Sequence, residues 1–531
     1  MLATLASCIG FMALVAWVSY VKTRGQAGTP EGYFLAGRGL TGTFIAGSLL
    51  LTNLSAEQLI GLNGSAYAFN LSSMAWEVTA VFALVIMATV LLPRYLRGGF
   101  TTLPEFLGRR FDDRVRRLSV LLFILGYGLV TIPSVLYSGS VAVLELFDVG
   151  ALLGVGDASA LLIVIFLIGA VGGLYAVAGG LRAVAVSDTL NGVGLLAVGV
   201  LVPVLGLVKL GDGSLAAGLA RLTSEHTHKL DAIGSATDPT PFATLFTGMI
   251  LANLFYWGTN QYVIQRTLGA RSLAEGQKGV LLSGFFKILI PFLMMVPGVI
   301  AFHLYGDEPG AMDRAYPRLV ADVLPAALGG FFLAVLLGAV FSSFNSLLNS
   351  AATLVCIDIV EPLLKREQSD ARRIRTARVA SIAIALVSFA IAPLLQFAPE
   401  GLWQVVRKFT GFYNVPIVAV VFAAFCMPRA APAGVIAAVL FHLPAYALVT
   451  FFWDTGLHFV HVYAVLFLVE LGIVWGFSRV MPAGRPAPPQ PPQPAPVDMR
   501  PWRWTRPVCV LLMLAVAGVY WLFSPWGLAG G

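Results

Sequence analysis

The sequence predicts an all-α integral membrane protein with about 14 transmembrane helices. Of its 531 residues, 58% are hydrophobic and only 11% are charged, which is too little charge to cover the surface of a soluble protein of this size. Apolar stretches of about 18 or more residues recur along the whole chain, and each can cross a hydrocarbon layer of about 30 Å. The sequence lacks the segments of about ten alternating polar and apolar residues that mark a membrane β-barrel.

We expect the spans, in order, over residues 3–21, 41–67, 75–93, 117–146, 158–180, 185–208, 241–265, 279–303, 325–357, 374–396, 402–427, 430–452, 459–478 and 507–524. Several contain Gly or Pro, which membrane helices tolerate when neighbouring groups satisfy the freed backbone. The first span is not predicted to be a cleavable signal peptide, because Lys22 and Arg24 follow it rather than precede it.

The basic residues predict the orientation. With the N-terminus outside, 26 of the 34 Lys and Arg residues fall in inward segments, including the stretch from Arg266 to Lys278. The net charge of +7 therefore reports topology, and no nucleic-acid partner is expected. These observations predict a multi-pass protein of the cell inner (plasma) membrane.

The sequence offers no catalytic or structural-metal motif. The four cysteines lie in apolar segments without CxxC spacing, and His226 and His228 share a loop that is more typical of a solvated surface than of a metal site. No nucleophile–base pair or phosphate-binding loop is evident, so an enzyme is not expected. No obligate protein partner is expected either.

Polar residues interrupt two of the predicted spans. The second span contains residues 52–58 (TNLSAEQ), and the seventh contains residues 253–261 (NLFYWGTNQ). Helix-competing residues and glycines here predict unwound backbone, whose free carbonyl groups can coordinate a hard cation. The two interruptions lie five spans apart, and paired discontinuous helices in inverted repeats mark a transport site. Interhelical hydrogen bonding is the alternative for any single residue.

A polar stripe runs along the ninth span. Its members recur at helical spacing and are Ala339, Ser342, Ser343, Asn345, Ser346, Asn349 and Thr353. Serine hydroxyls together with backbone carbonyls suit Na⁺, while small-residue helix packing is an equally good explanation of the stripe alone.

Isolated charges inside spans are candidate functional residues, because a charge in the bilayer is costly. They are Glu77, Asp188, Lys287, Arg407 and Glu470. Lys287 lies nine residues beyond Lys278, or roughly 13 Å along a helix. This depth predicts an acidic or polar partner, for which Glu77 is the candidate.

At these residues the chain resembles the sodium:solute symporter family, in its sodium–glucose and sodium–galactose cotransporter branch. The resemblance covers nearly the whole length. It is strongest at residues 33–38 (YFLAGR), 55–61 (SAEQLIG), 104–106 (PEF), 253–268 (NLFYWGTNQYVIQRTL) and 342–358.

The resemblance implies a LeuT-type fold, a core of two inverted five-helix repeats (5+5) with flanking helices. The predicted parts are an extra helix and inward loop (1–40), the first repeat (41–208), an outward loop (209–240), the second repeat (241–427), two additional helices (428–480), a proline-rich inward linker (481–506) and a final helix (507–531).

The resemblance also implies the binding residues. A Na⁺ site is expected from the backbone oxygens of Leu51, Leu54 and Ala339 and the hydroxyls of Ser342 and Ser343. In the sugar branch, the positions that hold hexose hydroxyls are here Gln58, Glu77, Asn253 and Lys287, with Tyr256 and Trp257 beneath the sugar; Asn53 is a further candidate. Asp188, with Ser342, Asn345 and Ser346, matches a second Na⁺ site of some relatives.

Two departures bear on the substrate. Arg407 replaces a Gln that contacts the sugar, and Ala80 replaces a Ser. A guanidinium can grip a carboxylate with two parallel hydrogen bonds, so a sugar acid is an alternative to a hexose.

The sequence thus predicts a secondary active symporter that couples inward Na⁺ flow to uptake of a sugar by alternating access. One alternative is a transporter-like solute sensor, which solute flux would exclude. Another is proton coupling through Glu57, Asp188 or Glu470.

Overall fold

The computed structural model describes residues 2–23, 35–146, 149–308, 312–364, 369–397, 402–481 and 497–530. Over these residues the chain is almost entirely helical, and its β structure is limited to two isolated bridges, Leu40 with Ala270 and Ser272 with Asp498. The proline-rich linker predicted from the sequence lies mostly outside the described residues.

The α-helices, in chain order, are α1 (Leu2–Thr23), α3 (Gly42–Asn53), α4 (Ala56–Ala68), α5 (Ala75–Val78), α6 (Ala80–Ile86), α7 (Leu92–Gly98), α8 (Leu103–Arg110), α9 (Asp113–Gly126), α10 (Ile132–Leu146), α11 (Val149–Leu153), α12 (Asp157–Leu210), α13 (Leu215–Ser224), α14 (Gly248–Leu254), α15 (Gln261–Leu268), α16 (Leu273–Ile290), α17 (Val296–Tyr305), α18 (Ala315–Val323), α19 (Ala326–Thr353), α20 (Glu361–Leu364), α21 (Asp370–Ile391), α22 (Leu402–Cys426), α23 (Pro432–Ala447), α24 (Phe459–Val480) and α25 (Thr505–Leu522). Short 3₁₀ and π-helical turns connect or interrupt them, among them the π turn η7 (Phe255–Thr259).

Ten helices within the described ranges are long and apolar enough to cross a membrane, and eleven if the bent pair Gly42–Asn53 and Gln58–Ala68 is counted as one span. The predicted spans 3–21 and 158–180 correspond to shorter apolar helices, Ala6–Lys22 and Asp157–Gly173. The count of about 14 is therefore not confirmed. The fifth and sixth predicted spans also fall in one helical element, α12. No proline lies between the two predicted spans to end the first helix.

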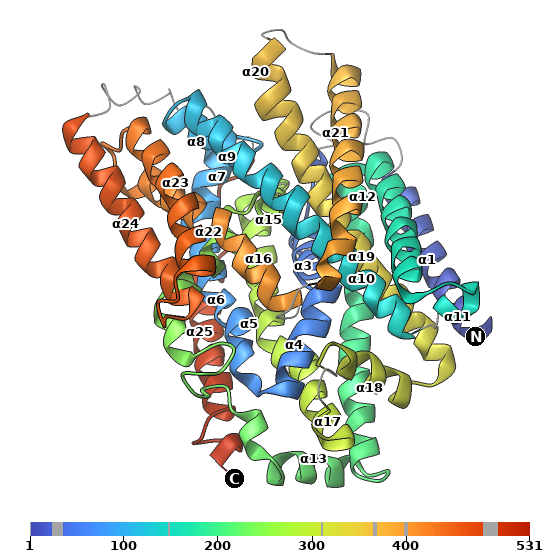
Figure 1. The fold of residues 1–531 in the computed structure, drawn as a ribbon. Helices are drawn as coiled ribbons and strands as arrows, with labels where there is room; N and C mark the ends of the chain where they lie inside the picture. Colours follow the sequence, from blue (N-terminus) through green and yellow to red (C-terminus); the bar gives the residue numbers. More distant parts are fainter. Residues whose placement is uncertain are drawn as a thin grey trace.

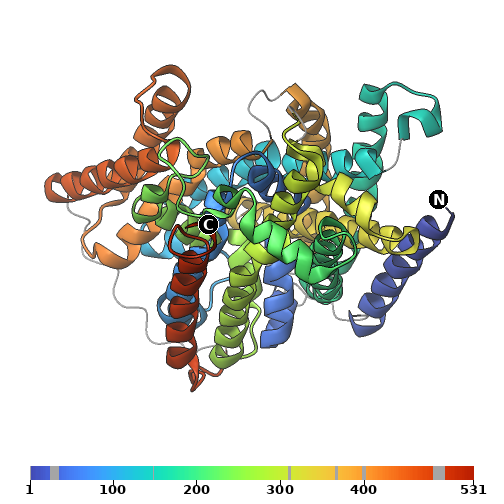
Figure 2. The same cartoon turned by 90° about the horizontal axis from the view of Figure 1, so that it is seen from below.

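The helices pack side by side around a buried middle (Figure 1). The N-terminal helix α1 lies at one edge and packs on α12 and α19, whereas α23 and α24 lie at the opposite edge, as a second view also shows (Figure 2). Between these edges α3 packs against α12 and α16, and α22 packs against α23 and α24.

The interruption predicted in the second span is present. α3 and α4 meet at an angle of 57°, and Leu54 and Ser55 between them leave the helical conformation. The Ser55 N–H bonds to the Asn53 carbonyl at 2.8 Å, so the Leu51 carbonyl loses the partner that it would have in a continuous helix.

The interruption predicted in the seventh span is present as well. After α14 the chain forms the π turn Phe255–Thr259, and Asn260 is extended (φ −73°, ψ 118°) before α15 begins. Single π turns inside helices are frequent at functional sites. Both breaks open onto the same region of the interior.

Candidate functional site

A small cavity of about 60 Å³ lies where the two broken helices meet. The residues that line it are Thr52, Asn53, Ser55, Gln58, Trp76, Glu77, Thr131, Val135, Ala252, Asn253, Phe255, Tyr256, Trp257, Asn260, Tyr262, Ser343, Leu347, Val406, Arg407, Thr410, Tyr413 and Asn414. Every substrate residue predicted from the sequence is among them except Lys287.

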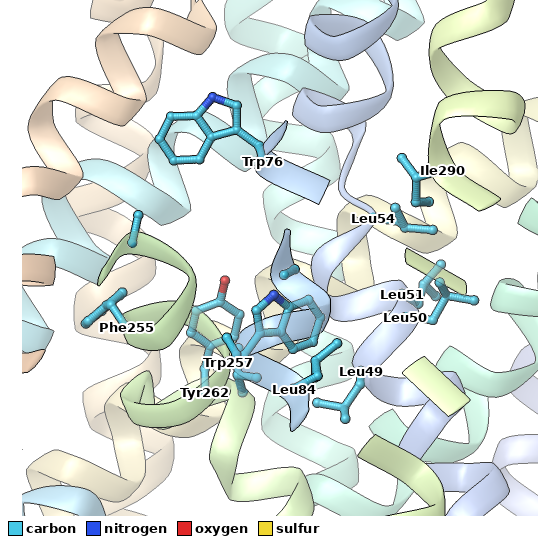
Figure 3. Close-up of a cluster of buried hydrophobic side chains, with 14 of the residues drawn as sticks. Leu49, Leu50, Leu51, Leu54, Trp76, Leu84, Phe255, Trp257, Tyr262 and Ile290 are labelled. Carbon is cyan, nitrogen blue, oxygen red and sulfur yellow. The ribbon is translucent and has the colours of Figure 1, made fainter. Parts of the chain in front are cut away.

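Aromatic rings form much of the wall. The rings of Tyr256 and Trp257 meet edge to face with centroids 5.0 Å apart, and Tyr256 meets Tyr262 in the same way at 5.8 Å. Figure 3 shows Trp76, Trp257 and Tyr262 reaching this region from different segments of the chain. Flat apolar faces of this kind suit a ring-shaped solute that also carries polar groups.

Glu77 on α5 joins two of the predicted residues. Gln58 Nε2 donates to Glu77 Oε1 at 2.8 Å, and Lys287 Nζ on α16 donates to Glu77 Oε2. All three side chains are buried. The Lys287 ammonium also lies over the Trp257 ring, 5.2 Å from its centroid. The sequence-based pairing of Lys287 with Glu77 is confirmed, and Lys287 reaches the cavity wall through Glu77.

Several polar atoms at the cavity have unused hydrogen-bonding capacity. Asn53 Oδ1, Ser55 Oγ and Gln58 Oε1 are buried without a hydrogen-bond partner among the described residues. Asn253 Nδ2 donates to Thr79 Oγ1 at 3.0 Å. Because a buried polar atom without a partner costs free energy, the first three atoms are suited to a solute rich in hydroxyl groups.

The first predicted Na⁺ site lies at the break between α3 and α4. Ser343 on α19 donates to the Thr52 carbonyl at 3.3 Å, which brings the serine pair of α19 against the unwound backbone. Ser342, Ala339 and Leu51 are buried, and the Leu51 carbonyl has lost its usual helical partner. Neutral hydroxyl and carbonyl oxygens at a helix break are ligands of the kind that Na⁺ takes in such transporters.

The residues predicted for a second Na⁺ are arranged differently. Asp188 Oδ2 accepts from Ser48 Oγ at 2.7 Å, Ser48 Oγ accepts from Arg266 Nε at 3.0 Å, and Arg266 donates to Ser346 Oγ. Asn345 borders a separate cavity between α1, α12 and α19. The structure thus links Asp188 and Ser346 through Arg266, and Asn345 lies outside this chain of contacts.

Arg266 is a functional candidate that the sequence analysis missed. The distribution of basic residues predicts it in an inward segment, whereas it lies in α15 and is fully buried. Helical spacing places it on the same side of α15 as Tyr262, whose carbonyl it contacts, and that spacing was the available signal. The cavity residues Thr131, Tyr262, Thr410, Tyr413 and Asn414 were also missed, because they come from three elements, the π turn Tyr127–Thr131, α15 and α22, that only the fold brings together.

Two further sequence predictions can be placed. Among the described residues no group of His, Cys, Asp and Glu is arranged to hold a metal ion, and the rings of His226 and His228 lie 6.0 Å apart, centroid to centroid. In the same loop Lys229 donates to the carbonyls of Tyr67 and Ala68, and burial lowers its pKa. The side chain of Glu57 lies outside the described residues.

Arg407 enters the cavity wall from α22. Its guanidinium lies over the Trp76 ring, 4.8 Å from the centroid, and Trp76 Nε1 donates to Thr240 Oγ1 at 3.2 Å. A cation over the face of a Trp ring is attracted by the ring quadrupole. Arg407, which stands where the resemblance implies a Gln, therefore places a positive charge at the cavity.

Comparison with known proteins identifies the family of the chain. The sodium:solute symporter family model matches residues 33–441. The uncharacterized symporter YidK of Escherichia coli is 42% identical, over 97% of this chain and 90% of its own. The sodium/glucose cotransporter of Vibrio parahaemolyticus is 30% identical, over 85% of each chain. The mouse sodium/myo-inositol cotransporter is also 30% identical, over 79% of this chain and 61% of its own.

The fold matches as well. A solved structure of a Na⁺-coupled sialic acid symporter in a substrate-bound outward-open state superposes with a TM-score of 0.79 at 20% identity, over 91% of this chain and 99% of that one. That symporter has the LeuT-type fold, and the likeness assigns this fold to the present chain. The chain belongs to the sodium:solute symporter family, as a multi-pass membrane protein that uses Na⁺ as its coupling ion.

Proposed function

We propose that the protein imports a sugar-like, polyhydroxylated solute through the cavity between α3, α4, η7, α19 and α22. The observation that carries this proposal is the unused hydrogen-bonding capacity of Asn53, Ser55 and Gln58 beside the rings of Tyr256 and Trp257. Acceptors beside aromatic faces are the combination that a sugar or cyclitol requires. The relatives named for glucose and myo-inositol transport support the same class.

The proposed Na⁺ ligands are the carbonyls of Leu51, Leu54 and Ala339 and the hydroxyls of Ser342 and Ser343. Since Ser343 already contacts the Thr52 carbonyl, Na⁺ at this position pulls α19 onto the unwound end of α3. This stabilises one arrangement of the two helices and completes the solute site beside Asn53. Solute binding then favours closure on the entry side, and loss of Na⁺ releases the contact.

The driving force follows from this arrangement. Inward Na⁺ flow is favoured by its gradient and by the membrane potential, which contributes about 2.3 kcal/mol per charge per 100 mV.

In the proposed orientation the N-terminus lies outside. Asp188 and Ser346 are the proposed residues of a second Na⁺ site, with Arg266 between them. Asn345 belongs to that site only if the cavity between α1, α12 and α19 admits an ion.

A sugar acid is a second candidate, because Arg407 lies at the cavity wall and is held over Trp76. A guanidinium recognises a carboxylate through two parallel hydrogen bonds. The name of the sialic acid symporter shows that the fold serves such a solute in another protein.

Uptake by reconstituted vesicles tests the proposal. Radiolabelled galactose, glucose, myo-inositol and a hexuronate would each be followed with an inward Na⁺ gradient and again with K⁺ replacing Na⁺. The proposal expects Na⁺-dependent uptake of at least one of them. Uptake of none would overturn the substrate class, and a protein that binds a solute without moving it would be a sensor.

A further inference from the structure

Three side chains outside the cavity bind backbone carbonyl groups of α22, the helix that carries Arg407. We name them, His442 and Tyr446 of α23 and Tyr463 of α24, the α22 dock. The contacts are Tyr463 Oη donating to the Arg407 carbonyl at 2.8 Å, Tyr446 Oη donating to the Lys408 carbonyl at 2.7 Å, and His442 Nε2 lying 3.1 Å from the Gly411 carbonyl.

The dock holds the half of α22 that lines the cavity. Pro416 lies inside α22 and has no N–H for the Phe412 carbonyl, so the helical hydrogen-bond ladder is incomplete at this point. Arg407 and Thr410, both at the cavity wall, lie on the N-terminal side of this gap. Contacts with α23 and α24 therefore replace part of the rigidity that the ladder loses.

The hydrogen bonds of the His442 ring fix where one proton lies. The Gly411 carbonyl can only accept, so Nε2 carries a hydrogen and donates it. Nδ1 lies 2.5 Å from Glu470 Oε1, and two lone pairs cannot face each other at that distance. One further hydrogen therefore lies between His442 and Glu470, and the pair as a whole is neutral.

This pair is costly to bury in a membrane helix bundle. Both side chains are fully buried, and Glu470 Oε2 has no hydrogen-bond partner within the described part of the chain. The ring of His442 also stacks on Tyr446, with centroids 5.4 Å apart and planes 9° apart. A pair of apolar side chains would fill the same space at lower cost, so a role beyond packing is indicated.

We propose that Glu470 is a positioning residue for the solute site. Glu470 holds the His442 ring in the tautomer and orientation that bind the Gly411 carbonyl. The dock in turn sets where the N-terminal half of α22 presents Arg407 and Thr410 to the cavity. The proposal rests on the proposed function of the cavity. Both residues of the pair lie beyond residues 33–441, the part of the chain that the family model matches.

Hydrogen–deuterium exchange of the full chain in nanodiscs tests the dock without any solute. Glu470→Leu removes the hydrogen bond, while Glu470→Gln keeps one, because its amide can donate to Nδ1. We expect exchange within residues 405–415 to be about tenfold faster in Glu470→Leu, the factor for one lost hydrogen bond, and parent-like in Glu470→Gln. Exchange within residues 417–426 should not change.

Two variants complete the design. Tyr463→Phe removes one dock contact with little change in shape and serves if Glu470→Leu does not fold. Tyr305→Phe is the matched control, because it removes a hydroxyl contact with Asp322 (2.6 Å) that does not involve α22. Unchanged exchange in both Glu470→Leu and Tyr463→Phe, or equal acceleration in the control, would overturn the proposal.

Transport kinetics separate positioning from general stability. With galactose as the probe, the apparent KM should rise about tenfold in Glu470→Leu while Vmax stays within about twofold, and Glu470→Gln should restore the parent KM. A fall in Vmax alone, or a Gln variant as impaired as the Leu variant, would contradict a positioning role. If the parent shows no Na⁺-dependent uptake of galactose, the assigned substrate fails, whereas the exchange experiment still decides the dock.

Discussion

Breaking the buried ion pair of Lys287 and Glu77 should destabilise the protein far more than breaking an exposed pair. Both side chains are only 2% exposed, and among the described residues Gln58 also donates a hydrogen bond to the Glu77 carboxylate. Lys287→Met leaves that carboxylate buried with one neutral donor. The expected loss is about 3–5 kcal/mol of unfolding free energy, the usual cost of an uncompensated buried charge.

A double-mutant cycle measures the pair itself. Glu77→Gln alone leaves the Lys287 ammonium buried and should cost a similar amount. The double variant Glu77→Gln/Lys287→Met buries no charge, so it should be more stable than the sum of the single losses by about 3 kcal/mol or more. Equilibrium unfolding in mixed micelles, followed by tryptophan fluorescence, gives the three free-energy differences.

The partly exposed pair of Lys278 and Glu275 supplies the control. Lys278 Nζ lies 2.8 Å from Glu275 Oε1, and the Lys278 side chain is 42% exposed. Lys278→Met should therefore lower the unfolding free energy by less than about 1 kcal/mol. The reasoning is refuted if Lys287→Met costs no more than Lys278→Met, or if the two single losses simply add. Uptake should stay low in the double variant even though part of the stability returns, because Glu77 is needed for the solute.

Three further predictions concern pH, packing and specificity. Burial lowers the pKa of His458 to about 4. As the pH falls below about 6.5, the unfolded chain therefore binds a proton before the folded protein does, and stability declines. Thermal unfolding measured from pH 7 to pH 4.5 should show this decline, and His458→Gln should flatten it. A Cβ on Gly248 would lie 1.8 Å from the Val460 carbonyl, so Gly248→Ala should lower the unfolding free energy by about 1–3 kcal/mol. Gly472, where a Cβ meets nothing within 4 Å, should tolerate Ala, and equal effects at both sites would contradict the packing argument. Arg407→Gln should reduce hexuronate uptake at least about tenfold more than galactose uptake, and an equal reduction of both would remove Arg407 from anion recognition.

The sequence was most informative about the two helix breaks. Polar side chains within otherwise apolar spans compete with helical hydrogen bonding. This effect is local, so a short run of consecutive residues is enough to predict it. The break at Leu54 and Ser55 and the extended Asn260 both fall inside the predicted segments. The division into two inverted repeats stays a prediction.

The sequence was least informative about pairs that form between distant helices. His442 and Glu470 are 28 positions apart, and nothing in either segment shows that the side chains meet. The excess of Lys and Arg in inward segments led to the prediction that Arg266 lies in such a segment. That rule counts basic residues near the ends of spans, and it does not distinguish a side chain that reaches the membrane surface from one buried against Ser48 and Tyr262. Such contacts depend on how α15 and α24 rotate in the bundle, which packing determines.

Binding of radiolabelled Na⁺ to the purified protein tests the central claim most directly, because it needs no solute. Ser343→Ala removes one proposed ligand, and Ser381→Ala is the matched control, since its hydroxyl is buried in α21 and donates to the Ala377 carbonyl of the same helix. We expect saturable Na⁺ binding in the parent and in Ser381→Ala, and an affinity lower by about tenfold or more in Ser343→Ala. Parent-like Na⁺ affinity in Ser343→Ala would contradict a Na⁺ site between α3 and α19.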